Sequence, residues 1–360
     1  MFSRQSLEFF MNKTFRFVIF SLLVSCLSLS VNAFQLEKPI AAKITAAPEE
    51  GVHGAGVNNK DVYLMKLKLS SREKAALFGF KPKKGFHEIS MLPAATNIGM
   101  NGVPVLDQGM HGACATFANT ALIDAALGRG DHVSQLCQLE LGAYLEKDSY
   151  MPSGWDGTVG PWVLDQMFRF GVVSKTKQRM RGCAGFRYYP TYSQSQGSPM
   201  SEDDFKVLSE DITKLLDPVF LLDFNQRFSS SFTPEKAEQI FNQTKELLAS
   251  GNRLTVGVVL VITDSCSVGA CAMHHVPLDT WAVTKELDIP GAETAGHEMV
   301  IMGYDDEGVA VDAEGNTHTG LFILRNSWSS AAGDHGNYYM TYEYFKKFAG
   351  ELQAVIPVKD

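Results

Sequence analysis

Basic residues are few in this 360-residue chain: 32 Lys and Arg stand against 40 Asp and Glu, which gives a net charge of −8 at pH 7. No block of Lys or Arg stands out. Because a nucleic acid is bound through a basic face, the composition argues against a nucleic-acid partner. With 45% hydrophobic and 20% charged residues, the chain has the composition of an ordinary globular protein with enough apolar residues for a large core.

The one prominent apolar run is short. Phe17–Val31 follows a few basic residues and is too short to span a bilayer comfortably. Val31, which ends the run, and Ala33 are small residues at the positions that a signal peptidase reads, so we expect residues 1–33 to be a cleavable signal peptide and the protein to be secreted or periplasmic. Two alternatives stay open: a retained anchor helix, and a lipoprotein cleavage box that ends at Cys26.

Cysteines are also few and odd in number once the signal is removed. The six cysteines are Cys26, Cys114, Cys137, Cys183, Cys266 and Cys271. Five remain after export, and an odd count indicates one free thiol beside two disulfides. The sequence does not fix the pairing. If Cys114 is the free residue, Cys137–Cys183 and Cys266–Cys271 are the natural pairs.

The segment 34–90 differs from the rest of the chain and is too small to be an independent domain. Ala41–Gly56 is rich in Ala, Gly, Pro and Glu, which is typical of a linker or mobile arm. Asp61–Leu69 alternates apolar with polar residues and predicts a strand. Ser70–Phe78 begins with a capping sequence and predicts a short helix.

From Val103 onward the pattern predicts a large α+β body, helical first and β-rich later. The expected helices are Cys114–Leu127, Pro161–Phe170, Glu202–Leu215 and Thr233–Ala249. The expected strands are Leu254–Ile262, Glu298–Tyr304, Gly320–Arg325 and Asn337–Thr341. We therefore expect a protein of two lobes.

Cys114 is the first candidate for chemistry. It lies at the start of an expected helix, where free N–H groups favour a thiolate over a thiol. Gln108, upstream in a glycine-containing stretch, can donate a side-chain N–H to a developing oxyanion. A cysteine nucleophile also needs an imidazole and a group that orients it. His297 at the mouth of one apolar strand and Asn326 at the end of the next are placed to supply them.

These residues resemble the papain (C1) family of cysteine peptidases. The resemblance spans about residues 92–350, and the matching motifs stand in the same order as in the family. They are Gln108-Gly109-x-x-Gly112-Ala113-Cys114, His297–Tyr304, Asn326-Ser327-Trp328 and Gly333–Tyr338. Gly154–Gly157 is a weaker match to the glycine-rich segment that binds substrate backbone. The resemblance implies a two-lobed fold with a helical N-terminal lobe and an antiparallel β-rich C-terminal lobe, within a peptidase domain at 91–360.

The same resemblance implies the roles of the site residues. Cys114 would be the nucleophile, His297 the general base and acid, and Asn326 the group that orients His297. Gln108 would help to form the oxyanion hole. Trp328 would shield the pair of His297 and Asn326, and Gly157 with Thr158 would bind substrate backbone.

The chain departs from the family pattern at several positions. His111 stands where the family has a cysteine, Ala115 replaces an aromatic residue, and Thr158 replaces a second wall glycine. Glu298 replaces a small residue and either raises the pKa of His297 or points away along the strand. The long spacing from Cys114 to His297 predicts a helical insertion at about 185–250.

The resemblance also implies how the peptidase is controlled and what it needs. We expect 34–90 to be a propeptide that is cleaved near 80–95, peptide or protein substrates, no metal or organic cofactor, and a monomer. One hypothesis is that His274 and His275, after the Cys266–Cys271 loop, restrict substrate length; a metal site there is less favoured. Two other functions remain: a catalytically inactive binding module, and another Cys/His acyl-transfer enzyme such as a transglutaminase.

Overall fold

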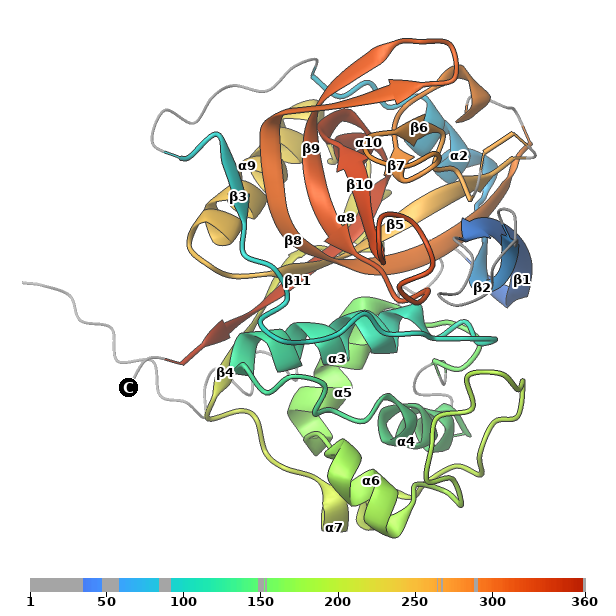
Figure 1. The fold of residues 1–360 in the computed structure, drawn as a ribbon, viewed down its shortest axis with the longest axis vertical. Helices are drawn as coiled ribbons and strands as arrows, with labels where there is room; N and C mark the ends of the chain where they lie inside the picture. Colours follow the sequence, from blue (N-terminus) through green and yellow to red (C-terminus); the bar gives the residue numbers. More distant parts are fainter. Residues whose placement is uncertain are drawn as a thin grey trace, which may run out of the picture.

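The computed structural model describes residues 35–46, 58–83, 92–147, 152, 154–263, 265–266, 268–287 and 291–358 (Figure 1). The expected signal peptide and the lipoprotein box at Cys26 lie outside these residues, as does the middle of the expected cleavage region, 84–91. Within the described part of the chain, no helix combines the length and the apolar character needed to cross a membrane.

Helices and strands both contribute about a third of the chain, at 31% and 33%. The helices are α2 (Ser71–Phe78), α3 (Cys114–Leu127), α4 (Gln135–Lys147), α5 (Gly160–Phe170), α6 (Lys175–Arg181), α7 (Glu202–Leu208), α8 (Phe224–Arg227), α9 (Pro234–Ala249) and α10 (Tyr342–Phe348). The strands are β1 (Gln35–Ala46), β2 (Asn58–Lys68), β3 (Ala95–Asn97), β4 (Leu216–Leu222), β5 (Leu254–Ile262), β6 (Ala272–Met273), β7 (Thr280–Trp281), β8 (Glu293–Asp312), β9 (Thr317–Arg325), β10 (Asn337–Thr341) and β11 (Ala349–Pro357).

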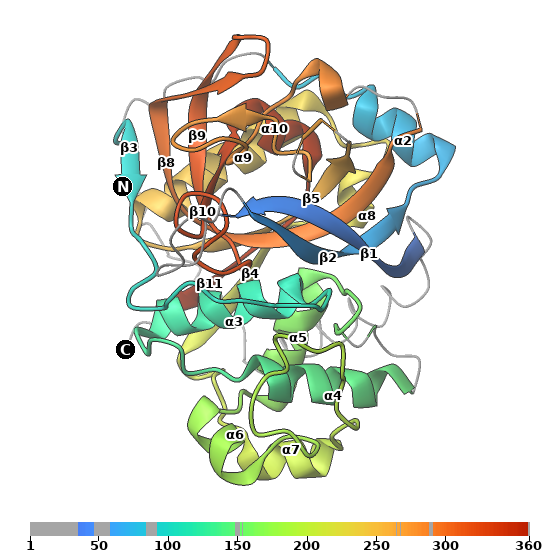
Figure 2. The same cartoon turned by 45° about the vertical axis from the view of Figure 1, so that its right-hand side comes forward.

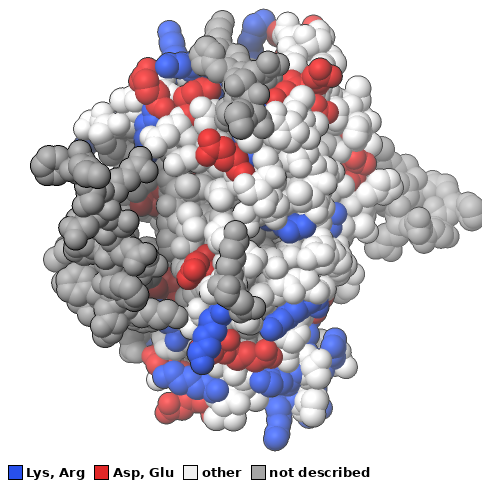
Figure 3. All heavy atoms as spheres, turned by 90° about the vertical axis from the view of Figure 1, so that its left-hand side faces the viewer, with Lys and Arg blue, Asp and Glu red and all other residues white. Residues whose placement is uncertain are grey.

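The described strands form one sheet. Some of the helices pack around this sheet, and the others lie together at the far end of the molecule. The strand order is β4-β11-β5-β8-β6-β7-β10-β9, with β8 also bonded to β9, β2 and β3. Helices α3 to α7 gather at one end, and α9 and α10 lie with the sheet at the other (Figure 1). Lys and Arg side chains gather at the end that holds α6 and α7 (Figure 3).

Helix α3 lies where the helical end meets the sheet. Its sequence, CATFANTALIDAAL, is apolar almost all round, so every residue from Cys114 to Ala125 is buried. Gly128 ends the helix in the left-handed conformation at φ 62°, which glycine adopts without strain. Because α3 packs against β8 and β11, its first turn is held beside the sheet.

The first part of the linker expected over Ala41–Gly56 belongs instead to a strand of an N-terminal hairpin. Residues as far as Ala46 belong to β1, which pairs with β2 in antiparallel register, with Ala41 opposite Tyr63 and Ala46 opposite Asn58. That expectation was wrong for 41–46 because Ile44 in this stretch is buried in the same core as β2. The remainder, 47–57, lies outside the described residues.

The segment 185–250 holds a strand as well as helices. The helix expected over Glu202–Leu215 ends at Leu208, because the backbone of Glu210 instead exchanges two hydrogen bonds with Val172. Leu216–Leu222 then forms β4, which pairs with β11 at the edge of the sheet. The expected helix Thr233–Ala249 is present as α9, with Thr233 as its N-cap and Pro234 in its first turn.

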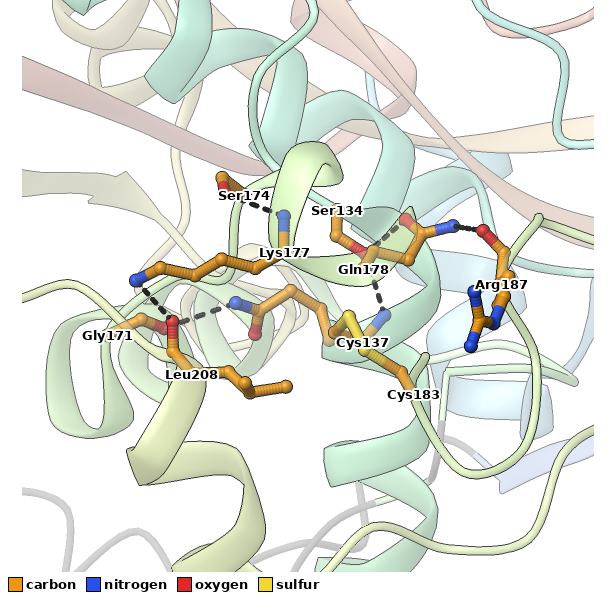
Figure 4. The surroundings of a disulfide bond; sticks show 10 residues. Ser134, Cys137, Gly171, Ser174, Lys177, Gln178, Cys183, Arg187 and Leu208 are labelled. Atoms are coloured by element: carbon orange, nitrogen blue, oxygen red, sulfur yellow. Dashed lines mark hydrogen bonds between the residues drawn. A yellow bond between two sulfur atoms is a disulfide. The ribbon is translucent and has the colours of Figure 1, made fainter. Parts of the chain in front are cut away.

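Two disulfides are present, and Cys114 is the free cysteine of the described residues. Cys137 in α4 is bonded to Cys183, which follows α6. Beside this bond, Gln178 accepts from the hydroxyl of Ser134 at 2.7 Å and donates to the carbonyl of Arg187 at 3.0 Å (Figure 4). The second disulfide, Cys266–Cys271, closes a small loop after β5.

Candidate active site

The turn that leads into α3 places Cys114 in the first turn of the helix. Gly109 has φ 58°, and a side chain there would collide with the backbone of Thr191. Gly112 donates its N–H to the carbonyl of Trp155 at 2.8 Å and leaves no room for a Cβ atom beside Asp156. The two glycines therefore let the backbone before Cys114 pack closely against neighbouring backbone, and this places Cys114 beside the sheet.

His297 and Asn326 are brought together by neighbouring strands. Nε2 of His297, in β8, lies 2.8 Å from Oδ1 of Asn326, which directly follows β9. Oδ1 of Asn326 also accepts the backbone N–H of Ser327 at 2.7 Å, which fixes the orientation of the amide. His297 Nε2 must then carry the proton, so that Nδ1 is a free base.

Trp328 covers the pair of His297 and Asn326. Its ring is stacked on the imidazole, with centroids 4.3 Å apart and an interplanar angle of 18°. Trp281 and Tyr338 pack around Trp328, and all three aromatic residues are buried. The hydrogen bond of the pair is thereby kept from water, which strengthens it.

Gln108 is fixed to the loop that carries Asn326. Its Oε1 accepts from the hydroxyl of Ser327 at 2.8 Å, and its backbone N–H donates to the carbonyl of Ser327 at 2.9 Å. Its Nε2 donates to the carbonyl of His111 at 2.9 Å and also faces the carbonyl of Tyr63 at 3.4 Å. One amide hydrogen is thus aimed at a carbonyl that comes from another segment of the chain.

That segment is strand β2 of the N-terminal hairpin, which covers the site. Figure 2 shows the hairpin along the boundary between α3 and the sheet. Met65 of β2 pairs with Gly296, the residue before His297, and a Cβ atom at Gly296 would lie 2.8 Å from Cε of Met65. Lys60 forms an ion pair with Asp107 at 2.8 Å and donates to the carbonyl of Trp328 at 3.0 Å.

Burial under this cover keeps both reactive groups neutral. Burial raises the pKa of the Cys114 thiol to about 12, and the nearby Glu298 carboxyl adds to the shift. Burial lowers the pKa of His297 to about 4, against a smaller opposing effect of its bond to Asn326. Nδ1 of His297 has no hydrogen-bond partner among the described residues. The covered site therefore holds a thiol and a neutral imidazole in place of an ion pair.

The proposed wall residues lie on opposite sides of one turn. Gly157 has φ 120°, and a Cβ atom there would meet the side chain of Met65, so this glycine faces the hairpin. Thr158 is buried and lines a small cavity of the helical end, together with Thr116 and Gln138. His111 fills the position of the family's cysteine by packing its ring edge-on against Trp155.

Glu298 points away from His297, into the interior behind Cys114. Its Oε1 accepts from Asn119 Nδ2 at 2.8 Å and from Gln353 Nε2 at 2.7 Å. Burial raises its pKa to about 8, and the neighbouring Glu351 is also buried with a raised pKa. Successive residues of a strand face opposite sides, so His297 and Glu298 are divided between the two faces of β8.

The histidines near the second disulfide form a separate cluster. His274 and His275 are stacked at 4.1 Å, and their Nδ1 atoms lie 2.7 Å from the carbonyl of Val309 and 2.8 Å from Asp334 respectively. Among the described residues, no group of three or more His, Cys, Asp or Glu is arranged to hold a metal ion. A role in substrate length stays a prediction.

Sequence reasoning missed the residues of the cover and of the interior behind the nucleophile. They are Lys60, Tyr63, Met65, Asp107, Asn119, Glu351 and Gln353. The alternation of Asp61–Leu69 did predict the strand that carries three of them. Nothing local could indicate that this strand lies over Cys114, because its partner in β8 is more than two hundred residues away.

No protein-family model matches the chain, and no curated protein matches it. Its fold is similar to that of xylellain, a cysteine protease from Xylella fastidiosa, at 17% identity over 78% of this chain and 96% of that chain, with a TM-score of 0.48. Digestive procathepsin L 3 of Tenebrio molitor is 16% identical over 80% and 79%, with a TM-score of 0.42. The bromelain protease from Ananas comosus, in complex with E64, is 15% identical over 75% and 100%, with a TM-score of 0.42.

These neighbours are papain-like cysteine proteases. At such low identity and TM-score, the activity of this chain has to be argued from its own residues.

Proposed function

We propose that the chain is an exported papain-like cysteine peptidase of two lobes, made as a proenzyme, that hydrolyses peptide bonds through an acyl-enzyme on Cys114. The observation that carries the proposal is the 2.8 Å contact of His297 Nε2 with Asn326 Oδ1 beneath Trp328. This contact leaves Nδ1 as the free base that a cysteine nucleophile requires. The free thiol of Cys114 at the start of α3 completes the set.

The first half of the reaction moves one proton through His297. As Sγ of Cys114 bonds to the substrate carbonyl carbon, Nδ1 of His297 takes the thiol proton. The carbonyl oxygen becomes an anion, and Gln108 Nε2 and the backbone N–H of Cys114 donate to it. The bond to the leaving amine then breaks as Nδ1 returns the proton to the amine nitrogen.

The second half releases the acyl group. His297 takes a proton from water, the hydroxide oxygen attacks the thioester carbon, and the Sγ–C bond breaks with the proton returning to Sγ. Asn326 holds the ring through Nε2 in both halves. No step needs a metal or an organic cofactor.

The hairpin supports a proenzyme. Met65 lies against both Gly157 and Gly296, and the Tyr63 carbonyl faces the amide of Gln108 that would bind the substrate's oxyanion. A peptide substrate needs the same space. We infer that 34–90 is the propeptide, that a cut near 80–95 releases it, and that 91–360 is the peptidase domain.

The test is hydrolysis of a fluorogenic peptide mixture by the processed protein, with Cys114→Ser, His297→Ala and Asn326→Ala beside the wild type. We expect cleavage by the wild type, none by Cys114→Ser, and a loss of about 10² to 10⁴ in kcat for His297→Ala. Amine incorporation into glutamine peptides without hydrolysis would contradict the proposal in favour of a transferase. Absence of both activities in processed wild type would favour an inactive binding module.

A further inference from the structure

A methionine of the hairpin fills a slot between two glycines of the site. The Cβ, Cγ and Sδ atoms of Met65 lie where a side chain of Gly157 would be, and its Cε atom lies against Gly296. Met65 and Gly296 stand opposite each other in the paired strands β2 and β8. The space between Gly157 and Gly296, here called the Met65 slot, is therefore occupied by the hairpin and becomes free when the hairpin leaves.

Glu298 stands beside the Met65 slot, on the same face of β8. Side chains two residues apart on a strand point the same way, so Glu298 shares the face of Gly296. Because Met65 is opposite Gly296, Met65 and Glu298 are diagonal neighbours across the two strands, about 7 to 8 Å apart at the backbone and within reach of a long side chain. Gly296 has no side chain that could close the space between them.

One short segment of the chain covers both side chains. Gly157 lies against Met65, and three residues later Gly160 lies against Glu298, where a Cβ atom would collide with both oxygens of the carboxyl. The Met65 side chain and the Glu298 carboxyl therefore lie next to each other between the same two segments, 157–160 and 296–298. The Met65 slot leads inward to the Glu298 carboxyl.

This inner end holds acceptors that lack donors. Oε1 of Glu298 accepts from Asn119 and Gln353, whereas Oε2 is buried without a hydrogen-bond partner among the described residues. Oε1 of the Gln353 amide is likewise buried and unpartnered there. Glu351 adds a second buried carboxyl, which accepts from the backbone N–H of Gly160 at 3.0 Å. All these donors are neutral, so they do not balance the negative charge of two buried carboxyls.

We propose that Glu298 selects substrates with a basic side chain, Lys or Arg, which enters the Met65 slot and pairs with the Glu298 carboxyl. The ammonium or guanidinium supplies donors to Oε2 of Glu298 and Oε1 of Gln353, and it supplies the positive charge that the two carboxyls lack. The aliphatic stem of the side chain takes the place of Met65. Burial raises the pKa of Glu298 to about 8, and a cation beside a carboxyl favours its charged form, so the acid releases its proton to water as the basic side chain binds.

Because this substrate class rests on the proposed peptidase function, the test is cleavage by the processed protein. Quenched fluorescent peptides carry Arg, Lys, Met or Leu at one position at a time, on both sides of the scissile bond. We expect one position at which Arg and Lys raise kcat/KM about tenfold or more over Met and Leu, since a close buried charge pair contributes at least that factor. A preference for Met or Leu at every position would overturn the inference.

Glu298→Gln keeps the shape of the side chain and removes its charge. It should lower the ratio of kcat/KM for Arg over Met at that position about tenfold or more. Glu140→Gln is the matched control, because Glu140 is a buried acid of α4 that lies against Gly197, outside the Met65 slot, and its substitution should leave the ratio unchanged.

A ratio that survives Glu298→Gln, or one that falls equally in Glu140→Gln, would also overturn the inference. If Glu298→Gln does not fold, the wild-type profile decides on its own. Failure of the wild type to cleave any of the peptides would refute the peptidase function itself, whereas cleavage without a basic preference would refute only the substrate class.

Discussion

Shortening Met65 should open the covered site and expose Cys114 to reagents. Met65 is 4% exposed, and its side chain lies against Gly157 and Gly296 at the centre of the contact between hairpin and site. Removing the side chain of a buried Met costs about 2 to 5 kcal/mol. If about 2 kcal/mol of that is lost from hairpin docking, the undocked fraction rises roughly thirtyfold, since 1.4 kcal/mol is tenfold.

The assay is the rate at which iodoacetamide alkylates Cys114 in the unprocessed exported chain. Cys114 is the sole cysteine there outside the two disulfides, because Cys26 leaves with the expected signal peptide. When docking is fast, the labelling rate is proportional to the undocked fraction. Met65→Ala should therefore be labelled about thirtyfold faster than the wild type.

Met167→Ala is the matched control, because Met167 is equally buried but lies in α5, away from the hairpin. A labelling rate for Met65→Ala equal to that of the wild type would refute the reasoning. An equal acceleration in Met167→Ala would also refute it, since the effect would then be general loosening of the fold.

Three further perturbations test the cover and the disulfides. Lys60→Ala, which removes a half-buried ion pair with Asp107, should accelerate labelling only a few-fold, as pairs of this kind contribute about 1 kcal/mol or less; a thirtyfold effect would be unexpected. The covered His297 has a pKa lowered from 6.5 to about 4, so its contribution to docking is complete above pH 6.5 and is lost as the pH falls towards 4. Hydrogen exchange of β2 amides, corrected for the intrinsic rate, should accelerate over that interval, and a constant rate would contradict the assignment. Cys137→Ala/Cys183→Ala opens a link across 46 residues and should lower the free energy of unfolding by about 4 kcal/mol, against about 2 kcal/mol for Cys266→Ala/Cys271→Ala across 5, measured by denaturant titration.

The elements that the sequence predicts best are those whose local pattern and burial agree. Cys114–Leu127 is a helix over the expected residues because its apolar residues recur at helical spacing and Gly128 ends it. Leu254–Ile262 and Asn337–Thr341 are strands over the expected residues because they are short and rich in β-branched or aromatic side chains.

Helix α4 escaped prediction because its interior is polar. Gln135, Gln138 and Glu140 are all buried, so the apolar stripe that marks a helix is interrupted. The two glutamines are paired across the fold instead: Gln166 donates to Gln138 at 2.8 Å, and Gln135 donates to Thr120 at 2.9 Å. Pairing of this kind depends on residues distant in sequence and leaves no periodic signal.

The candidate site likewise has one part that local sequence motifs predict and another part that they do not. The motifs around Gln108, Cys114, His297 and Asn326 are local, and the structure places Gln108, His297 and Asn326 in one hydrogen-bonded group beside the start of α3. The cover over that group is not local, because the strand that carries Met65 contains no sign of its partner. The direction of Glu298 was open for the same reason, since only its contacts with Asn119 and Gln353 decide which face of β8 it occupies.

The most direct test of the account is the intact mass of the processed protein after brief treatment with the epoxide inhibitor E-64, with Cys114→Ala treated beside it. The account predicts one covalent adduct on the wild type, none on Cys114→Ala, and much slower addition to His297→Ala, because Cys114 is activated only through His297. An adduct on Cys114→Ala, or peptide hydrolysis that survives this substitution, would contradict the central claim that Cys114 is the nucleophile.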